Sequence, residues 1–470
     1  MSEQSRYDVV IIGAGPGGYV AAARAGQLGM KVACVDKFDR LGGVCLNYGC
    51  IPAKALLDSS EYVAMAKNSF KKHGIRVGAP KVDLKVMMDR KNEVVRALTD
   101  NVETLLNANN VDIIRGSAEL ESAGRVSVTG GDGDRTVAAD NILLATGSRP
   151  IELEALPFDG RFIVSSSEAL AFEEIPKRLL IVGGGYVGLE MASVWSRLGS
   201  KVTVVEMADH IAGAVDGQLS RRLLRILKNQ NMEFKLKTRV TGAQVRKKTV
   251  KVTSMEDAKG EESDHICETV LVAVGRRPLS EGLGLENAGV DLDENGFVPV
   301  DAQYRTNVGN IYAIGDLIGG QMLAHKASAE GRAAVEIMAG KAGEVDYDTV
   351  PMVIYTAPEA AAVGKTEEQL KAQGVAYCTG TYPLTGAGRA RCMGETEGMV
   401  KILSHRKTDR VLGVHIIAPR ASDMIAEAVF AMTYGASSED IGRIMHGHPT
   451  FSEALQEAAL VAQECSIYTG

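Results

Sequence analysis

The chain has 470 residues, seven cysteines and a net charge of −7, with 52 basic and 59 acidic residues. This length predicts several domains with large cores and excludes a small scaffold held together by disulfides. The charges are spread without a basic block, which argues against nucleic acid or an anionic membrane surface as a partner. No apolar run approaches the roughly 20 residues that a helix needs to cross a bilayer, so we expect no membrane insertion.

The first residues and the cysteine count bear on the compartment. The sequence MSEQSRYDVVIIGAG enters an apolar strand too early to hold a signal or transit peptide. This predicts a cytoplasmic protein, or one in an organelle matrix if the chain is a processed mature form. The odd number of scattered cysteines argues against a secreted disulfide framework. In a reducing compartment, a cysteine pair that forms a disulfide is more often redox-active than structural.

Residues 7–36 (YDVVIIGAGPGGYVAAARAGQLGMKVACVD) read as a strand, a glycine-rich turn, a helix of small residues and a strand ending in an acid. This pattern is typical of a dinucleotide-binding βαβ unit. Gly13 allows the tight turn, Gly15 lets N–H groups approach a pyrophosphate, and Gly18 lets helix and strand pack closely. Asp36 can accept hydrogen bonds from a ribose.

Two cysteines, Cys45 and Cys50, follow within residues 41–57 (LGGVCLNYGCIPAKALL). On a regular helix their Cα atoms would lie about 8.6 Å apart, whereas a disulfide needs roughly 4.4 to 6.8 Å. If the sulfurs pair, we expect a distorted turn at Gly49, then a helix with Pro52 in its first turn and Cys50 at its positive end. Two buried structural cysteines, or half of a metal site, remain alternatives, although no second pair with ligand spacing follows.

The βαβ pattern returns in residues 178–206 (RLLIVGGGYVGLEMASVWSRLGSKVTVVE), with glycines at 183, 185 and 188. In both copies the acid lies 23 residues after the first glycine. One glycine motif is a weak signal, but two in the same strand, helix, strand and acid context are a strong one. The acid of the second copy, Glu206, would repel the 2′-phosphate of NADP, so we predict NAD for this site.

Both copies end in an apolar strand that runs into Gly-x-Arg-Pro, at residues 141–150 and 268–278. We expect each of these strands to close a nucleotide-binding unit. From Pro351 onward, strand-like runs alternate with amphipathic helices without a nucleotide motif, which favours an α+β interface domain.

A dithiol after the first glycine motif and a second glycine motif downstream resemble the flavoprotein disulfide reductases over essentially the whole chain. Residues 41–57 are similar to that family's redox-active disulfide segment, residues 306–316 (TNVGNIYAIGD) to its second flavin motif and residues 446–453 (HGHPTFSE) to its active-site base. The resemblance implies that Asp316 binds the ribityl chain of FAD and that residues 322–325 contact the isoalloxazine.

The family resemblance also implies a fold, an α/β architecture of two Rossmann-like dinucleotide-binding domains and a C-terminal α+β dimerisation domain. The predicted segments are 1–149 and 279–348 for the FAD-binding domain, 150–278 for the NAD-binding domain and 349–470 for the dimerisation domain.

Within the family, the motifs most closely resemble the members that oxidise dihydrolipoamide with NAD⁺. This implies that Cys45 exchanges with the substrate, that Cys50 faces FAD, and that His448 is a base oriented by Glu453. His446 as the base, an interface role for His448 and metal binding by these histidines with Glu453 remain alternatives. A reductase of another small disulfide and a non-catalytic flavin-bearing subunit are the other functions considered.

The resemblance adds Lys54 and Glu190 as an ion pair near the flavin and the nicotinamide, and it assigns cofactor contacts residue by residue. No metal site is predicted. The predicted FAD residues are Gly13, Gly15, Gly17, Gly18, Asp36, Lys37, Gly42, Gly43, Val44, Cys45, Lys54, Ala118, Thr146, Gly147, Ser148, Asp316, Met322, Leu323, Ala324 and His325. The predicted NAD residues are Gly183, Gly184, Gly185, Tyr186, Val187, Gly188, Glu190, Glu206, Val240 and Gly275.

The family resemblance implies two kinds of protein partner. The first is a second copy of the chain, because His448 is expected to reach the dithiol of the other subunit of a homodimer. The second is a lipoyl-bearing protein, either the lipoyl domain and acyltransferase core of a 2-oxo acid dehydrogenase complex or a glycine-cleavage lipoyl protein.

Overall fold

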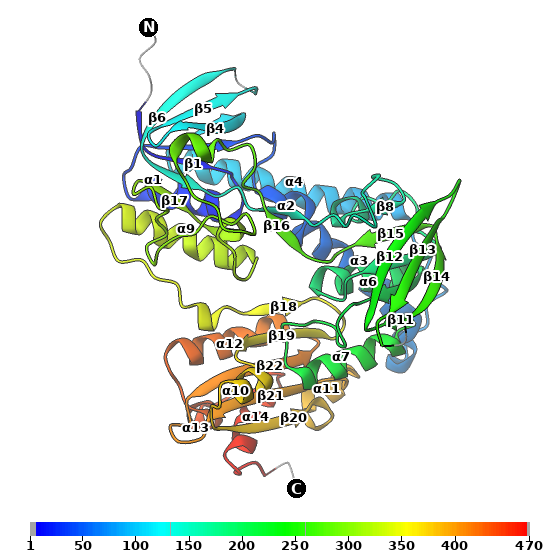
Figure 1. Ribbon diagram of the computed structural model, residues 1–470. Coiled ribbons are helices and arrows are strands. Elements are labelled where there is room, and N and C mark those ends of the chain that lie inside the picture. The colour runs from blue at the N-terminus through cyan, green and yellow to red at the C-terminus, as the bar shows by residue number, and fades with distance from the viewer. Residues whose placement is uncertain (1–5, 132, 259, 468–470) are drawn as a thin grey trace. The chain divides into compact units, whose positions relative to one another are not determined.

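The computed structural model describes residues 6–131, 133–258 and 260–467. The chain folds into two compact units, each built from separate segments (Figure 1). The first unit comprises Met1–Ala55, Met88–Ile151 and Gly275–Val345, and the second comprises Leu56–Met87, Glu152–Val274 and Asp346–Gly470. The predicted α/β fold class is confirmed, whereas the predicted four-segment division stays a prediction.

The first unit is built on a seven-stranded sheet of order β3-β2-β1-β6-β5-β4, in which β17 also pairs with β6. Side chains of β1 alternate between two cores: Val9 and Ile11 face one, and Val10 and Ile12 face the other. This strand is therefore buried on both faces, as its continuous apolar run predicts. The elements of this unit are β1 (Arg6–Ile12), α1 (Pro16–Gln27), β2 (Val32–Asp36), α2 (Gly43–Tyr48), β3 (Val111–Arg115), β4 (Ser117–Ser122), β5 (Arg125–Thr129), β6 (Arg135–Leu144), β7 (Ser148–Pro150), β16 (Arg276–Pro278), α8 (Leu285–Ala288), β17 (Ile311–Ala313), η2 (Gly315–Ile318) and α9 (Ala324–Met338).

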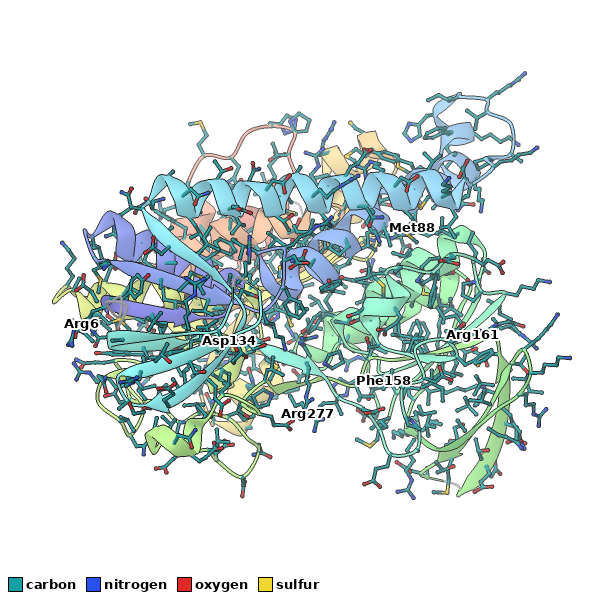
Figure 2. All side chains as sticks on the ribbon, turned by 90° about the horizontal axis from the view of Figure 1, so that it is seen from above. Arg6, Met88, Asp134, Phe158, Arg161 and Arg277 are labelled. Atoms are coloured by element: carbon teal, nitrogen blue, oxygen red, sulfur yellow. The ribbon has the colours of Figure 1, made fainter. Side chains whose placement is uncertain are left out.

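Two long helices, α3 (Cys50–Asn68) and α4 (Leu84–Ala108), continue from one unit into the other. Figure 2 shows α4 from the side as an uninterrupted helix, with Met88 labelled near its N-terminal end. Among the described residues, no helix combines the length and the apolar character that a membrane crossing requires.

The second unit holds three sheets. A parallel sheet has the order β11-β10-β9-β15-β8, and two antiparallel sheets have the orders β12-β13-β14 and β18-β19-β22-β21-β20. Helices α12 and α14 share a core with the last of these sheets, as expected for the α+β part. The elements are η1 (Phe70–His73), β8 (Ile163–Val164), α5 (Ser166–Ala169), β9 (Arg178–Val182), α6 (Tyr186–Leu198), β10 (Lys201–Val205), α7 (Gly217–Asn229), β11 (Met232–Lys235), β12 (Thr238–Val245), β13 (Val250–Glu256), β14 (Glu261–Cys267), β15 (Thr269–Val272), η3 (Tyr347–Thr349), β18 (Met352–Ile354), β19 (Glu359–Gly364), α10 (Glu367–Ala372), β20 (Tyr377–Pro383), η4 (Leu384–Gly386), α11 (Gly388–Met393), β21 (Met399–His405), β22 (Val411–Ala418), α12 (Ala421–Thr433), α13 (Ser438–Arg443) and α14 (Glu453–Ala462).

The two Gly-x-Arg-Pro segments have a relationship that the sequence did not reveal. The apolar strands before them lie in different sheets, because β6 pairs with β1 and β15 pairs with β9. The segments themselves pair with each other as the antiparallel strands β7 and β16, both in the first unit. They therefore pair the chain just before it leaves the first unit at Ile151 with the chain just after it returns at Gly275.

Candidate active site and dinucleotide sites

The first glycine of each βαβ copy makes the turn from strand to helix. Gly13 has φ +101° and Gly183 has φ +110°, a backbone region that residues with a side chain rarely adopt. A Cβ atom on Gly13 would also lie 2.5 Å from the carbonyl oxygen of Ala145. The turn chemistry predicted from the sequence is therefore present in both copies.

The acid at the end of the second strand has the same backbone partners in both copies. Asp36 accepts hydrogen bonds from the N–H groups of Ala14 at 2.7 Å and Phe38 at 2.9 Å. Glu206 accepts them from Gly184 at 2.6 Å and Ala208 at 2.7 Å. Burial raises the pKa of Asp36, although these N–H groups oppose the shift. Each carboxylate thus fixes the glycine turn, and its role as an acceptor for a ribose stays a prediction.

The residues at the two helix amino termini fit a dinucleotide pyrophosphate. Neither α1 nor α6 has a side chain that caps its first N–H groups. A Cβ atom on Gly15 would meet only the Cα atom of Gly43, at 3.9 Å, and one on Gly185 would meet no atom within 4 Å. Neither a capping side chain nor a close neighbour of these glycines therefore occupies the two helix amino termini, where the helix dipole favours phosphate.

The second flavin motif is held by the predicted Ser148 and by three side chains that were not predicted from the sequence, Arg276, Lys326 and Glu330. Ser148 donates a hydrogen bond to Asp316 and accepts one from Arg276 Nε at 2.7 Å. Lys326 and Glu330 form a buried ion pair of 2.8 Å on α9. Glu330 accepts the N–H of Gly315 at 2.8 Å, and Lys326 Nζ donates to the carbonyl oxygen of Gly319 at 3.1 Å. The segment that carries Asp316 is thus fixed at both ends.

The dithiol segment has the distorted turn that we predicted. Cys45 lies in α2, Cys50 is the first residue of α3, and Gly49 separates the two helices. A Cβ atom on Gly49 would lie 3.0 Å from the carbonyl oxygen of Val44, so the turn requires this close approach. Pro52 falls in the first turn of α3, as expected.

Cys45 is half-buried and Cys50 is exposed. The hydrogen bond with Cys50 and burial raise the pKa of the Cys45 thiol, against the opposing charge of Lys54. Cys50 lies at a helix amino terminus, where the dipole favours a thiolate.

The two histidines near the carboxy terminus differ in their surroundings. His448 has a side chain 79% exposed, and its Nδ1 lies 2.7 Å from Oε1 of Glu453. Burial alone would raise the pKa of the Glu453 carboxyl, but hydrogen bonds from His448 and from the N–H of Thr450 bring it below its usual value. A charged carboxylate on Nδ1 fixes the tautomer whose Nε2 accepts a proton.

His446 has a side chain only 5% exposed, and its Nε2 lies 2.6 Å from Glu427. Its Nδ1 lies 3.1 Å from the carbonyl oxygen of Ile444. The hydrogen bond with Glu427 raises the pKa of His446, which favours an imidazolium with both nitrogens donating. The geometry therefore favours His448 over His446 as the base.

The predicted site residues divide between the two units. Every predicted FAD residue, together with Cys50, lies in the first unit. The predicted NAD residues lie in the second unit except Gly275, which belongs to the first. Glu190, His448 and Glu453 also lie in the second unit, so the ion pair of Lys54 with Glu190 stays a prediction. Within the described ranges, no group of three or more His, Cys, Asp or Glu residues could hold a metal ion.

Two dinucleotide sites and a dithiol together define a flavoprotein disulfide reductase. The chain belongs to the pyridine nucleotide-disulphide oxidoreductase family, whose sequence model matches residues 7–331. The dimerisation domain of the same family matches residues 350–459.

Individual relatives cover almost the whole chain. The chain is 49% identical over 462 residues to dihydrolipoyl dehydrogenase 2, mitochondrial, of Arabidopsis thaliana, covering 98% of this chain and 91% of the relative. It is 49% identical over 458 residues to the leghemoglobin reductase of Vigna unguiculata, covering 97% of this chain and 88% of that relative. The crystal structure of LpdA from Mycobacterium tuberculosis superposes with a TM-score of 0.89 at 28% identity, covering 97% of this chain and 99% of that one.

These comparisons confirm the resemblance to dihydrolipoamide dehydrogenases and the prediction of an NAD-dependent flavoprotein oxidoreductase. The cofactors are FAD and NAD(H), and the residues at both glycine turns fit them. The match to the dimerisation domain also supports the predicted homodimer.

Exposed apolar residues in the dimerisation domain are candidates for the homodimer interface, and replacing one of them tests this. Phe430 and Tyr434 stack with ring centroids 4.8 Å apart, and their exposed fractions are 68% and 77%. Met445 is 98% exposed. We expect Tyr434→Asp to weaken dimerisation by at least about 30-fold, since aromatic hot spots are worth about 2 kcal/mol or more. Sedimentation equilibrium measures the dissociation constant.

The matched control is Val245→Asp, which places the same charge on an exposed residue at the end of β12, outside the dimerisation domain. This variant should dimerise like the unmodified chain. An unchanged dissociation constant for Tyr434→Asp would remove this surface from the interface.

Proposed function

We propose that this chain oxidises protein-bound dihydrolipoamide to lipoamide and transfers the electrons to NAD⁺. One observation carries the proposal: a dithiol at a helix amino terminus and a carboxylate-oriented histidine occur in a chain 49% identical to a dihydrolipoyl dehydrogenase. Such an exchange needs a nucleophilic thiolate, a disulfide to attack and a base that takes the thiol proton.

In the oxidised enzyme Cys45 and Cys50 form a disulfide. Nε2 of His448 takes the proton of one substrate thiol, and Glu453 stabilises the resulting imidazolium through Nδ1. The substrate thiolate attacks Sγ of Cys45, so the bond between the two cysteines breaks and Cys50 leaves as a thiolate. The helix amino terminus at Cys50 stabilises this leaving group.

The second substrate thiol completes the exchange. It attacks the substrate sulfur that is bonded to Cys45, which closes the lipoamide ring. The bond from that sulfur to Cys45 breaks, and Cys45 leaves as a thiol that takes up the proton of the second substrate thiol. The chain now holds the two electrons as its reduced dithiol. When bound, FAD accepts these electrons from the dithiol and supplies the hydride that NAD⁺ receives.

The proposed homodimer follows from the separate roles of the base, His448, and of the dithiol, Cys45 and Cys50. We assign the base of one subunit to the dithiol of the other, which makes the homodimer obligatory for activity. The lipoyl domain and acyltransferase core of a 2-oxo acid dehydrogenase complex, or a glycine-cleavage lipoyl protein, would present the substrate. A cytoplasmic or organelle-matrix location stays a prediction, and the relatives from Arabidopsis thaliana and Caenorhabditis elegans are mitochondrial.

A steady-state assay of the purified protein with dihydrolipoamide, other small dithiols and each nicotinamide nucleotide tests the proposal. We expect turnover with dihydrolipoamide and NAD⁺ to exceed that with the other dithiols. Faster turnover of another dithiol would replace the proposed substrate, and an inactive protein with FAD bound would favour the non-catalytic alternative.

Replacing Glu206 tests the choice of nucleotide. Glu206→Gln keeps an acceptor for the N–H of Gly184 but removes the charge that opposes a 2′-phosphate. We expect the preference for NAD⁺ over NADP⁺, measured as the ratio of kcat/KM values, to fall at least about tenfold, since like-charge contacts cost several kcal/mol. An equal loss with both nucleotides would instead assign Glu206 a purely structural role.

A further inference from the structure

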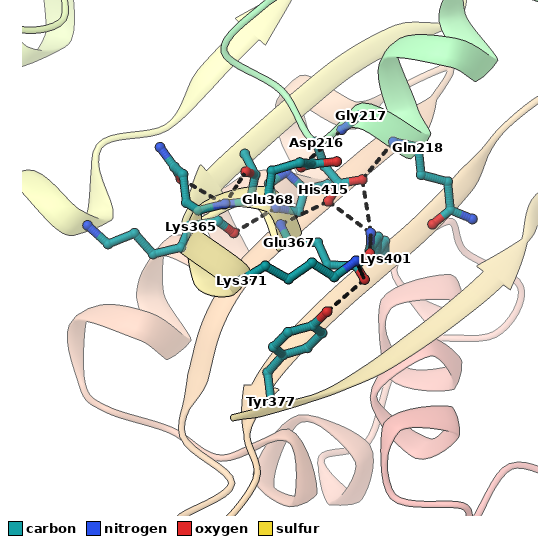
Figure 3. A network of polar contacts seen from close by, with 12 residues as sticks. Asp216, Gly217, Gln218, Lys365, Glu367, Glu368, Lys371, Tyr377, Lys401 and His415 are labelled. Atoms are coloured by element: carbon teal, nitrogen blue, oxygen red, sulfur yellow. Dashed lines mark hydrogen bonds and ion pairs between the residues drawn. The ribbon is translucent and has the colours of Figure 1, made fainter. Parts of the chain in front are cut away.

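The second unit contains a buried ionic network that the proposed chemistry does not use (Figure 3). Lys401 on β21 is 1% exposed, and its Nζ lies 2.9 and 2.8 Å from the two carboxylate oxygens of Asp216. Nζ also donates to Glu367 at 2.6 Å. Glu367 binds Lys371 and the hydroxyl of Tyr377, each at 2.7 Å. The buried ammonium is therefore fully paired, and the network joins the dimerisation domain to Asp216.

Asp216 lies where the NAD-binding segment meets this network. It is fully buried, caps the amino terminus of α7 by accepting the N–H of Gln218 at 2.9 Å, and accepts the N–H of Glu367 at 3.1 Å. The ten-residue connection 207–216 begins directly after Glu206 and ends with Asp216. It thus follows the predicted ribose acceptor at one end, and its other end is bound to Lys401.

The middle of the connection packs on the glycine turn of the NAD site. The N–H of Ala212 donates to the carbonyl oxygen of Gly184 at 2.8 Å. The N–H of Gly184 in turn donates to Glu206. Ala212 has φ +52°, an uncommon conformation for a residue with a side chain, so neighbouring contacts must hold it. Ser220 supplies one by donating to the carbonyl oxygen of Ile211 at 2.7 Å.

We propose that Lys401 and Asp216 are positioning residues for NAD binding, which fix the connection 207–216 and through it the glycine turn around Gly184. Lys401 lies in the family's dimerisation domain and Asp216 lies 185 residues earlier in the chain, so the effect passes between two segments within one unit. The inference rests on NAD binding alone and holds whether or not dihydrolipoamide is the dithiol substrate.

The direct test is the dissociation constant of NADH, measured by fluorescence titration of the FAD-loaded Asp216→Asn protein after full reduction, so that NADH finds no electron acceptor. Asparagine caps a helix as well as aspartate does, so this variant removes the ion pair and keeps the N-cap. We expect NADH to bind about 2- to 30-fold more weakly, the range that residues without ligand contact produce. The KM for NAD⁺ should rise with little change in kcat, and the FAD content should stay the same.

Lys371→Met is the matched control, because Lys371 also binds Glu367 but is exposed and does not contact Asp216. It should bind NADH like the unmodified chain. The pair Lys401→Met with Asp216→Asn leaves fewer buried charges unpaired than Lys401→Met alone, so it provides a second folded variant. It should weaken NADH binding in the same range as Asp216→Asn.

Three results would overturn the proposal. The first is unchanged NADH binding in both Asp216→Asn and the double variant. The second is an equal loss in Lys371→Met. The third is a parallel loss of NADH affinity and FAD content, which would show a general destabilisation of the fold. A chain that binds NADH normally but does not oxidise dihydrolipoamide would contradict the proposed function and leave this inference intact.

Discussion

Replacing His448 with glutamine should slow dihydrolipoamide oxidation at least about 100-fold, the lower end of what a general base contributes. Glutamine keeps a polar side chain of similar length but has no nitrogen that accepts a proton at neutral pH. The substrate thiol would then have to lose its proton to water before it attacks Cys45. Steady-state turnover with dihydrolipoamide and NAD⁺ measures the loss.

Two comparisons separate the loss of a base from a loss of fold. Reduction of an added dye by NADH does not need the thiol exchange, so it should survive in the His448→Gln protein. His446→Gln should lose much less activity, since His446 is buried against Glu427 and both of its nitrogens already have partners. Near-normal turnover of His448→Gln would remove the assignment of the base.

The choice between these histidines shows one limit of the sequence. His446 and His448 lie two residues apart in one motif, and either can serve as a general base. The family resemblance names His448, but the residue types alone leave both histidines open. The folded chain supplies a physical reason for His448, because burial and a carboxylate partner 19 residues earlier engage His446, while His448 stays exposed beside Glu453.

The glycine turns and the dithiol turn were predictable because their causes are local. A tight turn after a strand needs glycine within a few residues, and an acid 23 residues on can reach back to that turn after one βαβ crossover. Gly49 likewise lies close to the backbone of residues 44 and 45, its near neighbours in the chain, where a side chain would not fit without a shift. Short-range sterics leave few alternatives, so the pattern of residues specifies the structure.

The supporting side chains were not predictable, because their partners are distant in sequence. Arg276 reaches Ser148 over 128 residues, and Lys401 reaches Asp216 over 185. A buried lysine and an exposed lysine look alike in a sequence, and burial is decided by the sheet on which each one lies. The pair Lys326 and Glu330 has helical spacing, but this spacing also describes many pairs exposed to solvent.

The proposed sharing of the active site between two subunits predicts a gain of activity when two inactive proteins exchange subunits. One parent homodimer carries Cys45→Ser and Cys50→Ser, so it has no dithiol to exchange. The other carries His448→Gln, so it has no base. If the base serves the dithiol of the opposite subunit, every site in either parent lacks one of the two components, and both should show almost no dihydrolipoamide oxidation.

Subunit exchange changes the composition of the sites. In a heterodimer, one site combines the intact dithiol of one chain with the intact His448 of the other, while the second site lacks both components. Complete exchange of equal amounts makes about half of the dimers heterodimers, so activity should reach about a quarter of that of the unmodified protein. Distinct affinity tags on the two chains allow the heterodimer to be isolated and its turnover measured directly. If the base instead served the dithiol of its own subunit, no site in the heterodimer would be complete, and an isolated heterodimer as inactive as its parents would exclude the intersubunit arrangement.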